Sequence, residues 1–226
     1  MKIYLDTIGC RLNQSEIETM ARQFRAAGHE IVASAQGADL AVVNTCAVTS
    51  DAAADSRQMI RHIARLGVPQ IVPTGCWATL QPKEAASLPN VSQVIPNEQK
   101  DNLVVQFNSE FRIQNSEFDV EPINRTPLPG LHHRTRAFIK VQDGCDNACT
   151  FCVTTVARGN ARSRPLADVI ADIQFALAGG TKEIVLTGVH LGSWGQEWGR
   201  HLRELIHAIL AETDAPRLRL SSLEPW

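Results

Sequence analysis

The chain has 226 residues, enough for one large domain or two small ones, and its 44% hydrophobic content is typical of a protein that buries a core. No stretch approaches about eighteen uninterrupted apolar residues, and the N-terminus turns polar too soon for a signal peptide. We therefore expect a cytoplasmic protein without a membrane partner. Thiols stay reduced there, so the six cysteines are expected to be metal ligands, catalytic groups or buried thiols rather than disulfides.

The first hundred residues alternate short apolar runs with helical patterns. A helix is predicted to begin near Asn13, which has the spacing of a capping box with Glu16, and to end at Gly28. A second helical pattern ends at Gly67. Strands are predicted at residues 2–5, 40–44 and 70–72. This alternation indicates an open, mainly parallel α/β sheet.

Periodicity disappears before residue 133, and Pro and Gly accumulate in a polar context, which is typical of a linker. We therefore expect an N-terminal domain over residues 1–108, a linker over 109–133 and a second domain over 134–226. The second domain has a βαβαβ pattern that stops after a strand. Its predicted elements are a strand at 137–142, a helix that starts at Pro165 and ends before Gly179, a strand at 183–188, a helix at 199–211 and a strand at 217–222.

Three cysteines, Cys145, Cys149 and Cys152, form a C-x3-C-x2-C loop directly after the first strand of the second domain. Three thiolates on a short loop can hold three irons of a 4Fe-4S cluster and leave the fourth iron open to a small molecule. An open metal position is typical of a catalytic site. The alternative is a zinc knuckle completed by His132 or His133, although zinc loops more commonly use paired C-x2-C spacings.

The other three cysteines, Cys10, Cys46 and Cys76, each come shortly after a predicted strand of the N-terminal domain, in the segments IGC, NTC and TGC. Because the carboxyl ends of parallel strands meet at one edge of a sheet, we expect these thiols to lie close together. They could hold a second cluster, with Asn13 as a supporting side chain. The alternative is three independent buried thiols.

The C-x3-C-x2-C loop resembles that of the radical S-adenosylmethionine superfamily, in which the open iron binds S-adenosylmethionine and one electron splits the sulfonium to give a 5′-deoxyadenosyl radical. Together with the first triad, the chain resembles the radical S-adenosylmethionine methylthiotransferase family, from TIGCRLNQSEIE through NTC, TGC and RAFIKVQDGCDNACTFC to RLSSLEP. The resemblance implies an α/β N-terminal cluster domain, an incomplete radical S-adenosylmethionine (β/α) barrel, and two 4Fe-4S clusters with S-adenosylmethionine as cofactors. The family's remaining βα units and RNA-binding module are not in the sequence. We therefore expect a fragment, and whether this fragment is active without those parts stays an open question.

The resemblance also implies residues around the cofactor, each of which has a structural alternative. Phe151 could instead pack onto the core, and the LTG segment could simply shape the end of a strand. Arginines suit carboxylates and phosphates, so Arg158, Arg162 and Arg164 could contact the cofactor or tRNA, or be solvated loop residues. The residues expected to bind S-adenosylmethionine are Phe151, Arg158, Thr187, Gly188, His190 and Glu224.

The segment GCRLNQSEIE resembles most the branch that modifies N6-threonylcarbamoyladenosine beside the tRNA anticodon. A basic stretch supports a nucleic-acid partner: residues 121–164 hold seven Arg or Lys and three acids, a local charge of +4 in a chain of net charge −2. We therefore expect methylthio addition at C2 of that nucleoside, with tRNA and an electron donor such as a flavodoxin or ferredoxin as partners. The alternatives are isopentenyladenosine in tRNA, a ribosomal-protein aspartate, or a non-catalytic metal-bearing RNA-binding protein.

Overall fold

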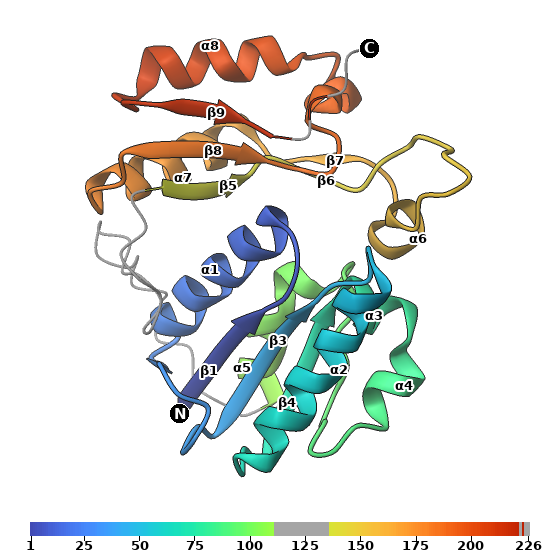
Figure 1. The fold of residues 1–226 in the computed structure, drawn as a ribbon. Coiled ribbons are helices and arrows are strands. Elements are labelled where there is room, and N and C mark those ends of the chain that lie inside the picture. Colours follow the sequence, from blue (N-terminus) through green and yellow to red (C-terminus); the bar gives the residue numbers. More distant parts are fainter. Residues whose placement is uncertain (111–135, 222, 224–226) are drawn as a thin grey trace. The chain divides into compact units, whose positions relative to one another are not determined.

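The structure is a computed structural model that describes residues 1–110, 136–221 and 223 (Figure 1). The chain divides into two compact units, one around residues 1–110 and the other around the described residues from 136 onward. The linker expected over 109–133 lies, apart from its first two residues, outside the described residues. Those two residues, Ser109 and Glu110, end a helix that the sequence analysis did not predict.

The first unit contains a four-stranded parallel sheet with the strand order β2-β1-β3-β4. Its strands are β1 (Lys2–Thr7), β2 (Glu30–Val32), β3 (Leu40–Thr45) and β4 (Gln70–Gly75). All six residues of β3 are buried, as expected for a central strand whose two faces are both covered. The parallel α/β prediction is therefore confirmed, although the three-residue β2 was missed.

Helices cover both faces of this sheet. Alternate residues of β3 enter two different cores: Val42 packs with residues of α1 and α5, and Val43 packs with residues of α2, α3 and α4. The predicted apolar faces of α1 and α2 are thus both buried. The helices are α1 (Arg11–Ala26), α2 (Ser50–Arg65), α3 (Cys76–Leu80), α4 (Pro82–Ala86), η1 (Lys100–Asn102) and α5 (Leu103–Glu110).

The capping box predicted at Asn13 is wrong. Helix α1 begins at Arg11, with Cys10 in the capping position and no side-chain cap. Asn13 and Glu16 therefore lie inside the first turns of the helix, where both are buried. A polar residue followed three positions later by Glu fits a cap by spacing alone, but these two side chains have tertiary partners instead.

The second unit is built on a three-stranded parallel sheet with the order β5-β8-β9, as the βαβαβ pattern predicts. Pro165 precedes the first connecting helix instead of starting it. Both helices bury apolar residues against the sheet in one core. The elements are β5 (Arg136–Lys140), α7 (Leu166–Ala178), β8 (Glu183–Thr187), α8 (Leu202–Glu212) and β9 (Leu218–Leu220).

A small ribbon that the sequence analysis did not predict lies between β5 and α7. It pairs β6 (Gln142–Asp143) with β7 (Arg162–Ser163) in antiparallel fashion, and α6 (Thr154–Arg158) lies between them in sequence (Figure 1). Two short 3-10 turns, η2 (Leu191–Ser193) and η3 (Gln196–Trp198), follow β8. Among the described residues, no helix is both long and apolar enough to cross a membrane.

Candidate functional sites

The first candidate site is the carboxyl edge of the N-terminal sheet. Cys10 follows β1, Cys46 follows β3 and Cys76 follows β4, and these three strands are neighbours in the sheet. Cys46 and Cys76 are buried, with 5% and 6% exposure, whereas Cys10 is exposed. The structure therefore places the three thiols at one sheet edge, as predicted.

Two glycines allow the strand ends to approach one another. Gly9 has a φ of 108°, and a Cβ added to it would lie 2.6 Å from Cys46 Cβ and 2.7 Å from Cys46 Sγ. Gly75 has a φ of 91°, and a Cβ added to it would lie 2.4 Å from the carbonyl oxygen and 2.6 Å from the nitrogen of Thr45. The glycines of the IGC and TGC segments thus have a packing reason, because any other residue would push the cysteine segments apart.

The surroundings of Cys46 change the pKa of its thiol. Burial raises the pKa of its thiol, and the neighbouring Cys10 and Cys76 raise that pKa further, whereas the N–H of Val48 lowers it. A thiol of this kind is deprotonated more easily when a metal supplies positive charge. The three cysteines therefore offer the donor type that iron–sulfur clusters use.

The thiols are gathered but are not arranged around a single ion. Among residues 1–110, 136–221 and 223, no three His, Cys, Asp or Glu side chains form a ready ligand set for one metal ion. A cluster takes its thiolates on different irons, so its ligands lie farther apart than those around one ion.

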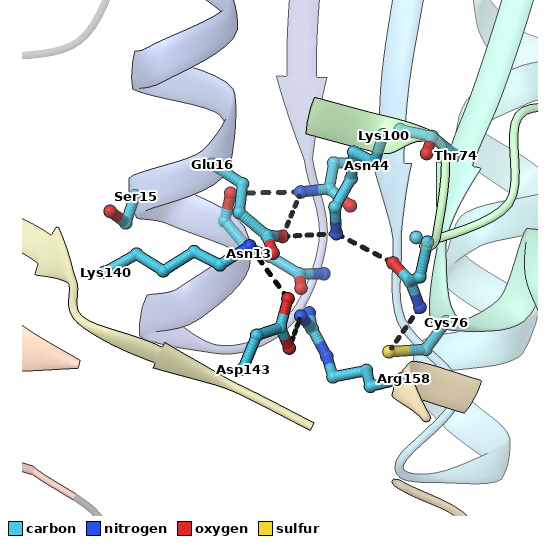
Figure 2. Close-up of polar contacts among 12 residues, drawn as sticks. Asn13, Ser15, Glu16, Asn44, Thr74, Cys76, Lys100, Lys140, Asp143 and Arg158 are labelled. Atoms are coloured by element: carbon cyan, nitrogen blue, oxygen red, sulfur yellow. Dashed lines mark hydrogen bonds and ion pairs between the residues drawn. The ribbon is translucent and has the colours of Figure 1, made fainter. Parts of the chain in front are cut away.

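A shell of buried polar side chains lies behind this edge (Figure 2). Asn13 Oδ1 is 3.8 Å from Cys10 Sγ, so Asn13 lies beside a cysteine, as expected for a supporting side chain. On the other side, Asn97 Nδ2 is 3.7 Å from Cys76 Sγ. Lys100 lies behind Asn97, in an ion pair of 2.6 Å with Glu16. Sequence reasoning missed Asn97 and Lys100, because nothing local links them to the cysteines.

The second candidate site is the loop that carries Cys145, Cys149 and Cys152, between β6 and α6. Cys149 is exposed and the other two are partly buried. At the base of the loop, the Cys145 N–H donates to the carbonyl of Gly159 at 3.1 Å, and Gly144 packs directly against the carbonyl of Asn160. The loop is therefore closed at its base, while its thiols remain near solvent.

A buried ion pair also closes this base. Arg158 Nη1 and Lys140 Nζ each lie 2.8 Å from the Asp143 carboxylate (Figure 2). Asp143 also accepts the N–H of Gly144. Arg158 is only 2% exposed. Its guanidinium has a structural partner in Asp143, as a buried charge requires, and its expected contact with S-adenosylmethionine or tRNA stays a prediction.

The other two arginines of this segment differ from each other. Arg164 Nη1 lies 2.6 Å from Asp172 and donates to the carbonyl of Lys140, so it also has partners within the fold. Arg162 keeps 47% of its side chain exposed. Its Nη2 lies 3.9 Å from the Asp143 carboxylate, so of the three arginines proposed to meet phosphate or carboxylate Arg162 is the most exposed and not unpaired.

Sequence reasoning also missed Gln142. Its fully buried side chain makes four hydrogen bonds: Nε2 donates to the carbonyls of Asp143 and Gly144 at 2.9 and 2.6 Å, and Oε1 accepts the N–H groups of Val189 and His190 at 2.9 and 2.8 Å. One amide therefore connects the start of the cysteine loop to the segment after β8. A glutamine at the end of a predicted strand gives no sequence signal for this role.

The remaining candidates for cofactor binding lie in different settings. Thr187 is buried at the end of β8, and a Cβ on Gly188 would lie 3.0 Å from Gln142, so this turn packs on the Gln142 side chain. His190 follows in the same segment. Phe151 is 91% exposed, so the alternative in which it packs onto the core is wrong. Glu224 lies outside the described residues.

The chain is similar in sequence to known proteins over nearly its whole length. Residues 2–96 match the model of "Uncharacterized protein family UPF0004". A threonylcarbamoyladenosine tRNA methylthiotransferase MtaB from Thermotoga maritima is 37% identical over 98% of the chain, and one from Bacillus subtilis is 35% identical over 96%. The ribosomal protein uS12 methylthiotransferase RimO of Chloroflexus aurantiacus is 29% identical over 94% of the chain. The chain spans about half the length of these relatives (51%, 50% and 51%).

Solved structures agree in fold. The radical S-adenosylmethionine methyltransferase TsrM from Kitasatospora setae matches 97% of the chain and 54% of its own with a TM-score of 0.65 at 15% identity. The cobalamin-dependent S-adenosylmethionine radical enzyme OxsB matches 84% of the chain and 34% of its own with a TM-score of 0.54 at 12% identity. At such identities the likeness concerns the fold alone. Over nearly its whole length the chain is therefore similar in sequence to methylthiotransferases, and its fold is that of radical S-adenosylmethionine enzymes.

Proposed function

We propose that the protein is a tRNA methylthiotransferase that replaces the C2 hydrogen of N6-threonylcarbamoyladenosine with a methylthio group. The observation that carries this proposal is the presence of two cysteine triads, one at the ends of three parallel strands in the first unit and the other on the loop after β6 in the second. The names of the Thermotoga maritima and Bacillus subtilis relatives support the substrate. In this proposal residues 1–108 form the methylthiotransferase domain and residues 134–226 belong to the radical domain.

In the second unit, Cys145, Cys149 and Cys152 would hold a 4Fe-4S cluster. When bound, such a cluster supplies the electron that cleaves S-adenosylmethionine reductively. The protein's own task is to hold the cysteine loop and the cofactor in a fixed position relative to each other. Gln142 serves this task by tying the cysteine loop to the segment that contains His190.

Three further residues would complete the cofactor site. Thr187 and Gly188 lie at the end of β8, next to the Gln142 side chain, and Phe151 stands between the last two cysteines with its ring exposed. An exposed aromatic ring costs free energy in water, and a bound nucleoside would cover it. These placements support a role of the three residues in cofactor binding.

In the first unit, Cys10, Cys46 and Cys76 would hold a second 4Fe-4S cluster that carries the sulfur to be transferred. S-adenosylmethionine would supply both the methyl group and, on reductive cleavage, the 5′-deoxyadenosyl radical that takes up the C2 hydrogen as 5′-deoxyadenosine. A flavodoxin or ferredoxin would supply electrons. The threonylcarbamoyl group is anionic, so its site must provide a hydrogen-bond donor, and the exposed Arg162 is one such group in the part of the chain described.

The substrate is tested by expressing the complete gene product in cells that lack their own methylthiotransferases and analysing tRNA nucleosides by mass spectrometry. We expect methylthio-N6-threonylcarbamoyladenosine. The control is the variant with Cys145, Cys149 and Cys152 replaced by Ala, which should give none. Methylthio on isopentenyladenosine alone, or on a ribosomal-protein aspartate, would reassign the substrate.

A further inference from the structure

A charged pair is buried behind the N-terminal cysteines. Lys100 and Glu16 expose only 1% and 2% of their side chains, and their charged atoms lie 2.6 Å apart. Glu16 also accepts an N–H from the Asn44 side chain at 3.1 Å. A buried ion pair of this kind is often no more stabilising than two apolar residues of similar volume. Stability alone therefore gives no reason for its place beside a cysteine site.

The pair is connected to Cys76 through Asn97. The backbone N–H of Asn97 donates to Thr79 Oγ1 at 2.9 Å, and Thr79 belongs to α3, the helix that starts at Cys76. The Asn97 side chain then lies between Lys100 and the cysteine: Oδ1 is 2.7 Å from Lys100 Nζ, and Nδ2 is 3.7 Å from Cys76 Sγ. In Figure 2 the dashed lines lead from Glu16 and Lys100 to the sulfur of Cys76.

Lys100 determines which end of this amide faces the sulfur. An ammonium group has three donors and no acceptor, so it can hold only the oxygen of Asn97. The NH2 end must then point toward Cys76. Glu16 fixes the ammonium in turn, because its carboxylate is the counter-charge in a site closed to water.

Cys10 has the opposite neighbour. The NH2 group of Asn13 is used by the carbonyls of Ile8 and Thr45, at 2.8 and 3.1 Å, so its oxygen faces Cys10 Sγ. One thiol of the triad thus faces a fixed donor and another faces an acceptor. The protein environment of the three sulfurs is unequal.

We propose that Asn97, oriented by Lys100 and Glu16, is a positioning residue that donates a hydrogen bond to the Cys76 thiolate and raises the reduction potential of the N-terminal cluster. This inference rests on the proposed function, which assigns a cluster to Cys10, Cys46 and Cys76. Hydrogen bonds to cluster sulfurs are an established influence on reduction potential. They stabilise the reduced state, in which the sulfurs carry more negative charge.

The test uses the complete gene product with Cys145, Cys149 and Cys152 replaced by Ala, so that only the N-terminal cluster can load. Its midpoint potential is measured by anaerobic redox titration, and its Fe–S stretching bands are recorded by resonance Raman in H2O and D2O. Asn97→Ala removes the donor without adding charge, and Asn97→Asp keeps a partner for Lys100 but cannot donate. The matched control is Asn102→Asp, which adds the same charge at an exposed position of η1.

We expect both Asn97 variants to have a lower midpoint potential and a smaller solvent-isotope shift of the Fe–S bands, with the larger fall in potential for Asn97→Asp. Asn102→Asp should match the parent in both readouts. An unchanged potential and isotope shift in a loaded Asn97 variant would overturn the inference and leave the cluster assignment intact. A parent protein that binds no iron, with its fold verified by circular dichroism, would overturn the cluster assignment itself and the inference with it.

Discussion

The two cysteine triads are built in opposite ways. Cys10, Cys46 and Cys76 are far apart in sequence and are brought together by the ends of three neighbouring strands, with two of them buried. The second triad spans only residues 145–152, on one loop whose thiols remain near solvent. The first site is therefore a product of the fold of its unit, whereas the second depends on the hydrogen bonds that close one loop.

This difference determines what a mutation should do. A change behind the first triad acts on packed core and a buried charge, so it should affect the stability of the sheet. A change at the base of the second triad should release the loop while the rest of its unit stays folded. The predictions below test this contrast, from the largest expected effect to the smallest.

The largest effect is expected for Lys100→Met. It leaves Glu16 buried without its counter-charge, which costs about 3–5 kcal/mol. Hydrogen exchange of β3, followed by mass spectrometry, should become faster as stability is lost, since β3 is buried along its whole length. Lys83→Met, at an exposed lysine of α4, is the control and should cost under about 0.5 kcal/mol.

The double variant with Glu16→Met and Lys100→Met sharpens this test. It removes both charges and should recover part of the loss, because the uncompensated carboxylate is the costly group. Unchanged protection of β3 in Lys100→Met would contradict the view that this pair supports the first site.

The next effect concerns Gly9→Ala. The new Cβ would meet Cys46 Cβ and Sγ at 2.6 and 2.7 Å, so overpacking of about 1–3 kcal/mol adds to the backbone strain. Gly28→Ala is the matched control, because it has a similar positive φ of 82° but no atom within 4 Å of the new Cβ. Thermal unfolding of the two variants separates crowding from strain. Equal losses of thermal stability in the two variants would show that the close approach to Cys46 adds nothing to the cost of Gly9→Ala.

Gln142→Glu should act on the second triad alone. A carboxylate still accepts the N–H groups of Val189 and His190 but cannot donate to the carbonyls of Asp143 and Gly144, which costs about 1–3 kcal/mol. Hydrogen exchange should increase in residues 143–160 and stay unchanged in β3. Increased exchange in both units would mean that the two sites are not independent.

A smaller, pH-dependent effect is expected at Glu197. Burial raises the pKa of this carboxyl, but hydrogen bonds from the N–H of Ser163, from its own N–H and from the Ser163 hydroxyl together lower it overall. The lowered pKa stabilises the folded state above the unfolded value of about 4.3, and this stabilisation is lost as the pH falls through the folded pKa.

Glu197→Gln should therefore remove part of the stability change between about pH 5 and pH 3, measured by thermal unfolding. Because the side chain is largely exposed, the effect should stay below about 1 kcal/mol. An identical pH profile in the variant would show that the contact with Ser163 does not hold the β6–β7 ribbon.

The sequence predicts the features that follow from periodicity and from strand ends. The apolar stripe of α1 identifies its buried face, and the position of each cysteine after a strand identifies the shared edge in the first unit. The start of α1 was misassigned because Asn13 and Glu16 have the spacing of a cap and yet are buried by tertiary contacts.

The remaining features depend on contacts between distant residues. Lys100 is 84 residues from Glu16, and no local pattern pairs them. Gln142 bonds to residues 47 and 48 positions away, and β6 and β7 contain two residues each, too few to give a period. Arg158 pairs with Asp143, 15 positions earlier, and no local pattern predicts that contact.

The central claim is that each triad holds its own cluster and that the two have separate roles. The measurement that tests it most directly is iron, sulfide and zinc analysis of the anaerobically reconstituted complete gene product, combined with 5′-deoxyadenosine formation. We expect about eight irons and no zinc, and about four irons in each triple-alanine variant. Replacing Cys145, Cys149 and Cys152 should abolish 5′-deoxyadenosine, whereas replacing Cys10, Cys46 and Cys76 should preserve it. Full iron in the first variant, or loss of 5′-deoxyadenosine in a folded second variant, would contradict the account.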